Sequence, residues 1–383
     1  MPQRIHKKSR NGCLECKRRH VKCDERQPIC SNCAAAERAC GYGSRSLRTV
    51  PPVLPRARAH SALRSSILSS ASPESPAGDS SPTPSTKQPV NLLHIELFHN
   101  LYTKIRPTFD PNRSIPWLGD DMDFSMMTPY LMNELLAFSA LHLSTKCPNQ
   151  RAYFRYHAAE LQTNALSLFK ASSANVTKEN CVPIFVFAAA LGIHMLADTL
   201  IYREGDLPDF LDRYVHFFRV YHGVRTIVGK AADVIPDTPL GPAFEMGKEL
   251  YRFTGSLGPT CESLLDMIYT AKLGKDVTAI YKQAIESLQS CLNVIEKWNS
   301  ERHVGINAVT TWPILMDIQF GEFLAQRRPE ALVILAHYAC LLHRFRHFWL
   351  FGDSGAWIIG QVGGYLGGEW EGWMGWPNEV LGS

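Results

Sequence analysis

Six cysteines near the N-terminus repeat one spacing twice. The order is Cys13-x2-Cys16-x6-Cys23, then six residues, then Cys30-x2-Cys33-x6-Cys40. Thiolates are soft ligands that select zinc, and in an intracellular chain clustered thiols indicate metal binding rather than disulfides. A segment of about 30 residues buries too little apolar surface to fold alone, so metal binding would supply the folding free energy.

The ligand count indicates two metal ions. A single tetrahedral zinc takes four ligands and would leave two thiols unused, whereas two zincs need eight ligand positions, which six sulfurs fill if two of them bridge. The pseudo-symmetric choice of bridges is Cys13 and Cys30. One zinc would then be bound by Cys13, Cys16, Cys23 and Cys30, and the other by Cys30, Cys33, Cys40 and Cys13. The alternatives are a disulfide knot and a single zinc with spare thiols.

The two halves of this repeat differ in charge. Between Cys16 and Cys23 lie Lys17, Arg18, Arg19, His20, Val21 and Lys22, whereas the segment 34–39 between Cys33 and Cys40 is mostly alanine. A short cationic helix on a metal core suits a DNA groove, because lysine and arginine neutralise phosphates and the arginine fork can bind guanine edges. The alternative is a solvated charged face. In the connecting loop, the fixed φ of Pro28 would help turn one half onto the other.

The segment KSRNGCLECKRRHVKCDERQPICSNC resembles the DNA-binding domain of fungal Zn2Cys6 binuclear-cluster transcription factors at all six cysteines. The resemblance implies two zinc ions, with the first and fourth cysteines as bridges, and a first helix that enters the major groove at CGG triplets. It implies base contacts from Arg19, His20 and Lys22. The implied phosphate contacts are Lys7, Lys8, Arg10, Lys17 and Arg18. The family more usually has lysine or arginine at the position of His20.

Charge is distributed unevenly over the 383 residues. Residues 1–48 contain twelve Lys and Arg against four Asp and Glu, a net charge of +8, and the rest of the chain carries −4. The basic end is therefore expected to bind nucleic acid. The stretch MPQRIHKKSR has no apolar core, so a signal peptide is not expected, and it resembles a basic nuclear-import run, although the same lysines would also suit phosphate contacts.

A Ser/Pro-rich linker is predicted between two domains. The predicted boundaries are residues 1–43 for the zinc domain, 44–89 for a disordered linker, and 90–383 for an all-helical regulatory or effector domain. The linker segment SSILSSASPESPAGDSSPTPSTKQP is too polar to form a core. Its few leucines hint at one amphipathic helix but are too few for a coiled coil, so any homodimer would form through the large domain.

The large domain is predicted to contain about nine helices and no succession of alternating strands. Asn91 suits an N-cap, and Thr128 followed by Pro129 suits the start of a helix. The expected helices span 91–105, 128–144, 150–171, 178–198, 207–229, 260–272, 276–299, 305–325 and 329–350. The apolar stretch 181–197 is shorter than the roughly 20 residues that span a bilayer, so we expect a buried helix and no membrane span.

Diffuse motifs in the large domain resemble the effector domain of the sterol uptake control branch of these factors. They include LLHIELFHNLYT, TPYLMNELLAFSALHLS and RPEALVILAHYACLLHRFRHFWLFG. The resemblance implies an all-helical dimer with an apolar pocket for a sterol. Regulators of secondary-metabolite gene clusters share this layout. The Gly- and Trp-rich tail 360–377 is predicted to be a ligand lid, an aromatic plug on the core or a partner surface.

Nothing in the sequence carries a catalytic site. The motif Gly352-Asp353-Ser354-Gly355 lacks a matching histidine signature, and His343 with His347 near Cys340 lacks a third ligand. The sequence therefore predicts a nuclear, DNA-binding RNA polymerase II transcription factor for CGG-type sites, with lipid, sterol or secondary-metabolite genes as targets. The alternative is a zinc-dependent protein-interaction module on a helical ligand-binding scaffold.

Overall fold

The structure, a computed structural model, describes residues 13–19, 21–26, 30–36, 90–109, 128–172, 176–238, 240–250, 252–253, 255–298 and 301–382. The chain divides into two units, Met1–Pro84 and Ser85–Ser383. The predicted linker 44–89 lies outside the described residues. The described part of the first unit contains two short helices, α1 (Leu14–Arg18) and α2 (Ser31–Ala34).

The second unit is helical, and no strand occurs in its described residues. This confirms the predicted all-α class. Its helices are α3 (Leu92–Asn100), the π-helical η1 (Leu101–Ile105), α4 (Arg106–Phe109), α5 (Pro129–Lys146), η4 (Pro148–Gln150), α6 (Arg151–Ser172), α7 (Cys181–Ile201), α8 (Leu207–Ala232), η5 (Ile235–Asp237), α9 (Gly241–Leu250), α10 (Pro259–Thr270), α11 (Lys275–Lys297), α12 (Arg302–Leu315), α13 (Ile318–Ala325), α14 (Pro329–Arg344), α15 (Ser354–Leu366), η6 (Gly368–Met374) and α16 (Gly375–Gly382).

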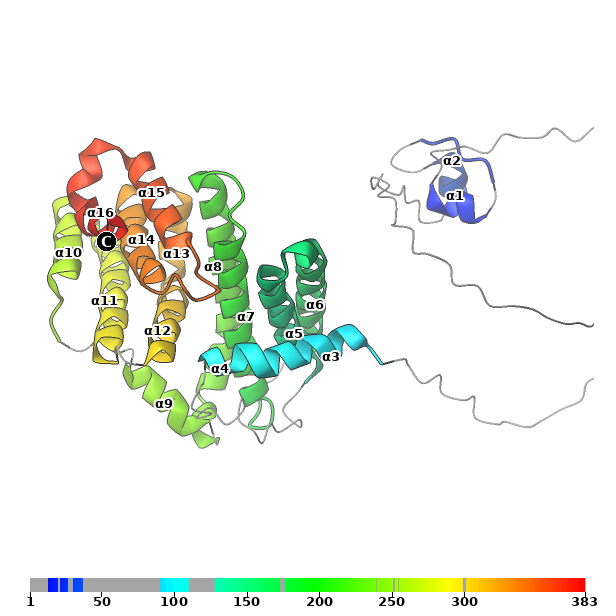
Figure 1. Cartoon of the computed structure of the whole chain (residues 1–383), viewed down its shortest axis with the longest axis horizontal. Helices are drawn as coiled ribbons and strands as arrows, with labels where there is room; N and C mark the ends of the chain where they lie inside the picture. Colours follow the sequence, from blue (N-terminus) through cyan, green and yellow to red (C-terminus); the bar gives the residue numbers. More distant parts are fainter. Residues whose placement is uncertain are drawn as a thin grey trace, which may run out of the picture. The chain divides into compact units, whose positions relative to one another are not determined.

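In this unit, helices that follow one another in the sequence pack side by side as pairs. The closely packed pairs are α5 with α6, α7 with α8, α11 with α12, and α14 with α15. Figure 1 shows the α7–α8 pair between the α5–α6 pair and the group formed by α10 to α16, while α3 crosses α5. Short connections between consecutive helices favour this arrangement.

Two helices form the centre of the core. Every residue from Ala331 to Leu342 in α14 is buried, and α14 contacts α10, α11, α13, α15 and α16. In α7, 67% of the most apolar 18-residue window is buried, and α7 packs against α5 and α8. By length and composition α7 could cross a bilayer, but its burial is that of a core helix.

Several helix boundaries predicted from the sequence are wrong. The predicted helix 305–325 is broken, because Met316 and Asp317 are extended and the Asp317 carboxylate accepts the Gln319 N–H at 2.8 Å, which starts α13. The predicted helix 329–350 ends at Arg344. By contrast, Asn91 caps α3 through the His94 N–H as predicted, and Pro129 takes the first position of α5 without a side-chain cap from Thr128.

The Gly- and Trp-rich tail is helical and packs on the core. It forms the second half of α15, all of η6 and the start of α16, and these three elements contact α14. Trp370, Trp373 and Trp376 are partly buried against the core cluster. Of the three predicted roles, the aromatic plug agrees with this packing.

Candidate metal centre and nucleic-acid interface

Five of the six N-terminal cysteines lie in described residues, and their sulfurs gather in one cluster. Cys13, Cys16, Cys23, Cys30 and Cys33 are at most 3% exposed, whereas Cys40 lies outside the described residues. Cys30 Sγ lies 3.7 Å from Cys13 Sγ and 3.6 Å from Cys16 Sγ. Zn–S bonds of about 2.3 Å in a tetrahedron place sulfurs about 3.8 Å apart, so the spacing fits zinc.

The cluster also brings the two halves of the repeat together. Cys13, the first cysteine of one half, has its Sγ 3.7 Å from Cys33 Sγ in the other half. Cys30, the first cysteine of the second half, lies beside Cys16 of the first half. A bridging thiolate must lie within reach of ligands from both halves. Cys13 and Cys30 meet this requirement.

Backbone donors help to hold this cluster in its anionic form. The Cys16 N–H donates to Cys13 Sγ at 3.4 Å, and this bond is the main cause that lowers the pKa of the Cys13 thiol to about 6. Burial raises the pKa of the Cys16 thiol to about 12. A bound metal ion deprotonates a coordinating thiol outright, so zinc would replace the proton on Cys16.

Three polar side chains that the spacing argument missed connect the two halves. The Asp24 carboxylate accepts the Ser31 N–H at 3.1 Å and the Ser31 hydroxyl at 2.6 Å, and this side-chain bond lowers the pKa of Asp24. Asn32 Nδ2 donates to the Lys22 carbonyl at 2.7 Å. These bonds attach the segment after α1 to the start of α2. The signal in the sequence was small: an Asp directly after Cys23 and a Ser directly after Cys30.

The predicted cationic helix is shorter than expected. Helix α1 ends at Arg18, Arg19 is its C-cap, and Lys22 lies outside the helix. Lys17, Arg18, Arg19 and Lys22 are all exposed. Two hydrogen bonds of 2.9 and 3.0 Å tie the Arg18 guanidinium to Glu15. No ion pair involves the other three within the described part of the cluster. Lys7, Lys8, Arg10 and His20 lie outside it.

Comparison with known proteins agrees with this geometry. Residues 11–49 match the fungal Zn(2)-Cys(6) binuclear cluster domain. The chain is 27% identical to a Zn(2)-C6 fungal-type transcription factor of Gibberella zeae, over 92% of this chain and 81% of that protein. The chain therefore contains a fungal Zn(2)-Cys(6) binuclear cluster domain and is similar to fungal Zn(2)-C6 transcription factors. Its cluster domain binds two zinc ions, and the predicted cofactor is confirmed.

Two further relatives extend this similarity. The Zn(2)-C6 fungal-type transcription factor afumD of Aspergillus fumigatus is 22% identical over 88% of this chain and 86% of that protein. Sterol uptake control protein 2 of Saccharomyces cerevisiae is 48% identical over 68% of this chain, which spans only 28% of that protein. Proteins named as transcription factors are not enzymes, in agreement with the sequence prediction.

The catalytic and metal motifs outside the cluster have structural explanations. His347 is not on the helix of His343, because α14 ends at Arg344. Within the described residues, the group that meets metal-ligand spacing is Cys13, Cys16, Cys23 and Cys30. Gly355 packs where a Cβ would come within 2.5 Å of the Ala339 carbonyl oxygen, so this glycine permits close contact between α14 and α15.

Proposed function

We propose that this protein is a nuclear, sequence-specific transcription regulator of RNA polymerase II genes that binds CGG-type DNA sites through its zinc domain. The observation that carries the proposal is the combination of a zinc-compatible sulfur cluster with the exposed cations Lys17, Arg19 and Lys22, which form no ion pair within the described residues. A rigid metal core fixes the direction of these side chains, and their charge neutralises phosphates.

We assign the six cysteines Cys13, Cys16, Cys23, Cys30, Cys33 and Cys40 as zinc ligands, with Cys13 and Cys30 as bridges. The assigned base contacts are Arg19, His20 and Lys22. The assigned phosphate contacts are Lys7, Lys8, Arg10, Lys17 and Arg18. The Arg18 guanidinium is already bound to Glu15, so Lys17 is the better test of a phosphate contact. Arg19, the C-cap of α1, forms no ion pair with any described residue and is the better test of base reading.

Fluorescence anisotropy of the zinc-loaded full chain tests this proposal. We expect tighter binding to a duplex that contains CGG triplets than to a scrambled duplex of equal composition, with affinity falling steeply as salt rises. Arg19→Ala should reduce the preference for CGG by roughly tenfold, because a bidentate guanine contact contributes about 1–3 kcal/mol of discrimination. Lys17→Ala should weaken binding to both duplexes alike and reduce the salt slope by about 1.

Lys170→Ala, an exposed lysine on α6, is the matched control and should change neither affinity nor preference. Equal affinity of the zinc-loaded chain for CGG-containing and scrambled duplexes would rule out sequence-specific recognition. Absence of any DNA binding would favour the alternative, a zinc-dependent protein-interaction module.

The helical body is proposed as the regulatory part of the molecule. The relative named for sterol uptake control supports lipid or sterol genes as targets, and secondary-metabolite genes are the other candidates. The sterol pocket and the homodimer stay predictions from the resemblance. Sedimentation of the full chain at several concentrations would test the dimer.

A further inference from the structure

The helical body contains a cavity of about 840 Å³. Its lining comes from the α3–α4 stretch, the second half of α5, the start of α12 and the segment after α14. This volume lies within the roughly 300–1,000 Å³ of sites that bind small molecules. The cavity is therefore large enough for an organic ligand.

The charged lining of this cavity is mainly cationic. Lys104, Lys146 and Arg302 line it together with one carboxylate, Glu301. Glu301 already has a partner, because its Oε2 lies 3.5 Å from His303 Nδ1. None of the three cations forms an ion pair with a carboxylate in the part of the chain that the structure describes. The cavity is therefore a favourable place for a negative charge.

The buried residues in the lining of the cavity carry no charge at pH 7. Ile306 and Phe348 are buried there, and the Trp349 ring lies edge-on to the buried His142 ring at a centroid distance of 4.8 Å. Burial, with a contribution from Lys146, lowers the pKa of His142 to about 4, so this imidazole is neutral at pH 7. Asn100 fixes the ring through contacts of 3.1 and 3.2 Å to His142 Nδ1.

One wall of the cavity has an unusual backbone. Asn100, Lys104, Pro107 and Thr108, all from the α3–α4 stretch, line this wall. The stretch passes through the π-helical turn η1, and Pro107 supplies no N–H to the Thr103 carbonyl four residues earlier. Such π-turns are rare and occur frequently at functional sites.

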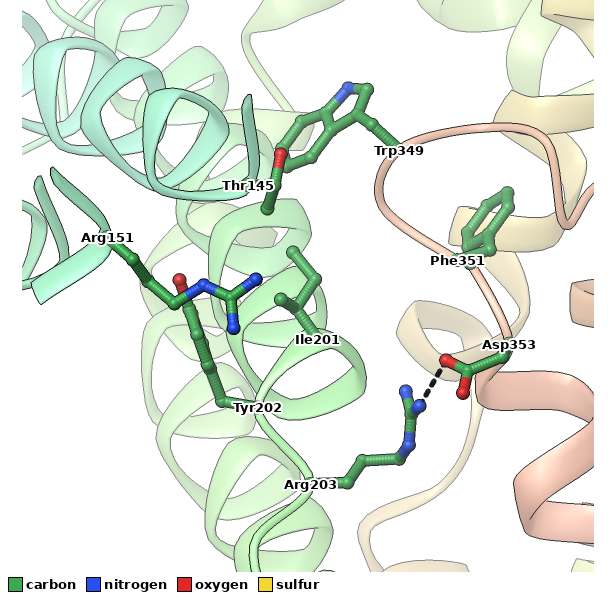
Figure 2. Close-up of a pocket in the computed structure, with 9 residues that line it drawn as sticks. Thr145, Arg151, Ile201, Tyr202, Arg203, Trp349, Phe351 and Asp353 are labelled. Carbon is green, nitrogen blue, oxygen red and sulfur yellow. Dashed lines mark hydrogen bonds and ion pairs between the residues drawn. The ribbon is translucent and has the colours of Figure 1, made fainter. Parts of the chain in front are cut away.

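A smaller neighbouring cavity contains an arginine that does have a carboxylate partner. It measures about 130 Å³ and shares Trp349 with the larger one. Figure 2 shows that its Arg203 guanidinium faces Asp353, to which it is ion-paired and hydrogen-bonded. The fold therefore supplies a carboxylate partner to this arginine in the small cavity, but to none of the three cations of the large one among the described residues.

We propose that the large cavity binds an amphipathic organic anion, a molecule with one negatively charged head and an aromatic or hydrocarbon body. The head would contact Lys104, Lys146 and Arg302, and the body would pack on Ile306, Phe348 and Trp349. A neutral sterol would bring no charge to these cations. The inference goes beyond the proposed function, because binding in the helical body does not require the zinc domain to read DNA.

Two fluorescent dyes with the same ring system test the charge requirement on the full chain. Anilinonaphthalene sulfonate carries a negative charge, and phenylnaphthylamine is its neutral counterpart without the sulfonate. We expect the affinity for the anionic dye to be at least about tenfold higher than that for the neutral dye. High salt should reduce the affinity for the anionic dye, because it screens the charges. Lys146→Gln and Arg302→Gln should each reduce the affinity for the anionic dye about three- to tenfold and leave the affinity for the neutral dye unchanged.

Lys170→Gln is the control for nonspecific attraction of the anion and should leave its affinity unchanged. Far-UV circular dichroism should show that each glutamine variant keeps the wild-type melting temperature, since the replaced cations have no ion pairs within the described residues. Naphthalene acetate should displace the anionic dye, whereas naphthalene acetamide should not. Equal affinity for the two dyes, no binding of the anion, or variants that bind the anion like wild type would each overturn the proposal.

Discussion

At the scale of single residues, Cys13 has the largest consequence for the zinc domain. Its sulfur lies beside those of Cys30 and Cys33. Under the proposed bridging assignment, Cys13→Ala would remove a ligand shared by both metal ions. We expect two zinc ions per wild-type chain and less than one per chain in the variant, by elemental mass spectrometry. Cys147→Ser, at a half-buried cysteine after α5, should keep two. A Cys13→Ala chain with two zinc ions would contradict the bridging assignment.

A buried histidine in α14 makes the stability of the helical body depend on pH. Burial lowers the pKa of His337 to about 4, below its ordinary value of 6.5. Between these values the unfolded chain binds the proton and the folded chain does not, so this contribution to stability is complete above pH 6.5 and is lost as pH falls towards 4.

Denaturant unfolding at pH 7, 6 and 5 checks this expectation through the difference between wild type and His337→Leu. The wild-type free energy of unfolding should fall more steeply over this range than that of the variant. His216→Gln, at an exposed histidine on α8, is the control and should follow the wild-type curve. Parallel curves for wild type and His337→Leu would show that His337 does not contribute to the pH dependence.

Residue types and spacing were sufficient to predict the metal cluster but not the hydrogen bonds that connect its two halves. Six cysteines at a repeated interval leave few chemical alternatives, whereas Asp24, Ser31 and Asn32 are common polar residues whose hydrogen bonds depend on the folded path of the chain. The same is true of the Arg18–Glu15 pair, because only the observed end of α1 shows which cations stay unpaired.

At the scale of helices, apolar periodicity predicted most of the elements and missed their interruptions. The pattern of 305–325 is continuous, yet the Asp317 cap starts a new helix after an extended Met316. The Gly- and Trp-rich tail was not predicted to be helical, because glycine has a low helix propensity. Its apolar residues pack on the core, and this packing outweighs the low propensity. Helix α9 was missed altogether.

Two glycines of α15 differ in what they contact, which gives a matched test of the α14–α15 packing. A Cβ on Gly355 would lie 2.4 Å from the His343 nitrogen and 2.5 Å from the Ala339 oxygen, whereas a Cβ on Gly360 would meet nothing within 4 Å. We expect Gly355→Ala to destabilise the fold by about 1–3 kcal/mol through overpacking. Gly360→Ala should stabilise it by about 0.5–1 kcal/mol, because alanine favours the helix. Thermal melts of both variants measure the difference, and equal melting temperatures would contradict the close packing.

At the scale of the whole molecule, the sequence predicted two functional parts but could not predict the cationic cavity. Asn100, Lys146, Arg302 and Trp349 come from four segments spread over about two thirds of the chain, and no local pattern relates them. Their convergence depends on how α3, α5 and α12 pack, which is a tertiary property. The cluster, by contrast, is local, so its spacing could be read directly from 28 consecutive residues, Cys13 to Cys40.

Because the zinc domain and the helical body have separate cores, removal of zinc should affect them differently. The described sulfurs form a cluster without an apolar core of their own, whereas the body buries a continuous core from Leu97 to Met374. We expect a strong zinc chelator to abolish binding of the full chain to a CGG-containing duplex, since metal binding supplies the folding free energy of the small domain. The far-UV helical signal and the main thermal transition should change little, and zinc addition should restore DNA binding. Loss of most of the helical signal on chelation would show that zinc stabilises the body as well, and unchanged DNA binding would show that the metal has no part in recognition.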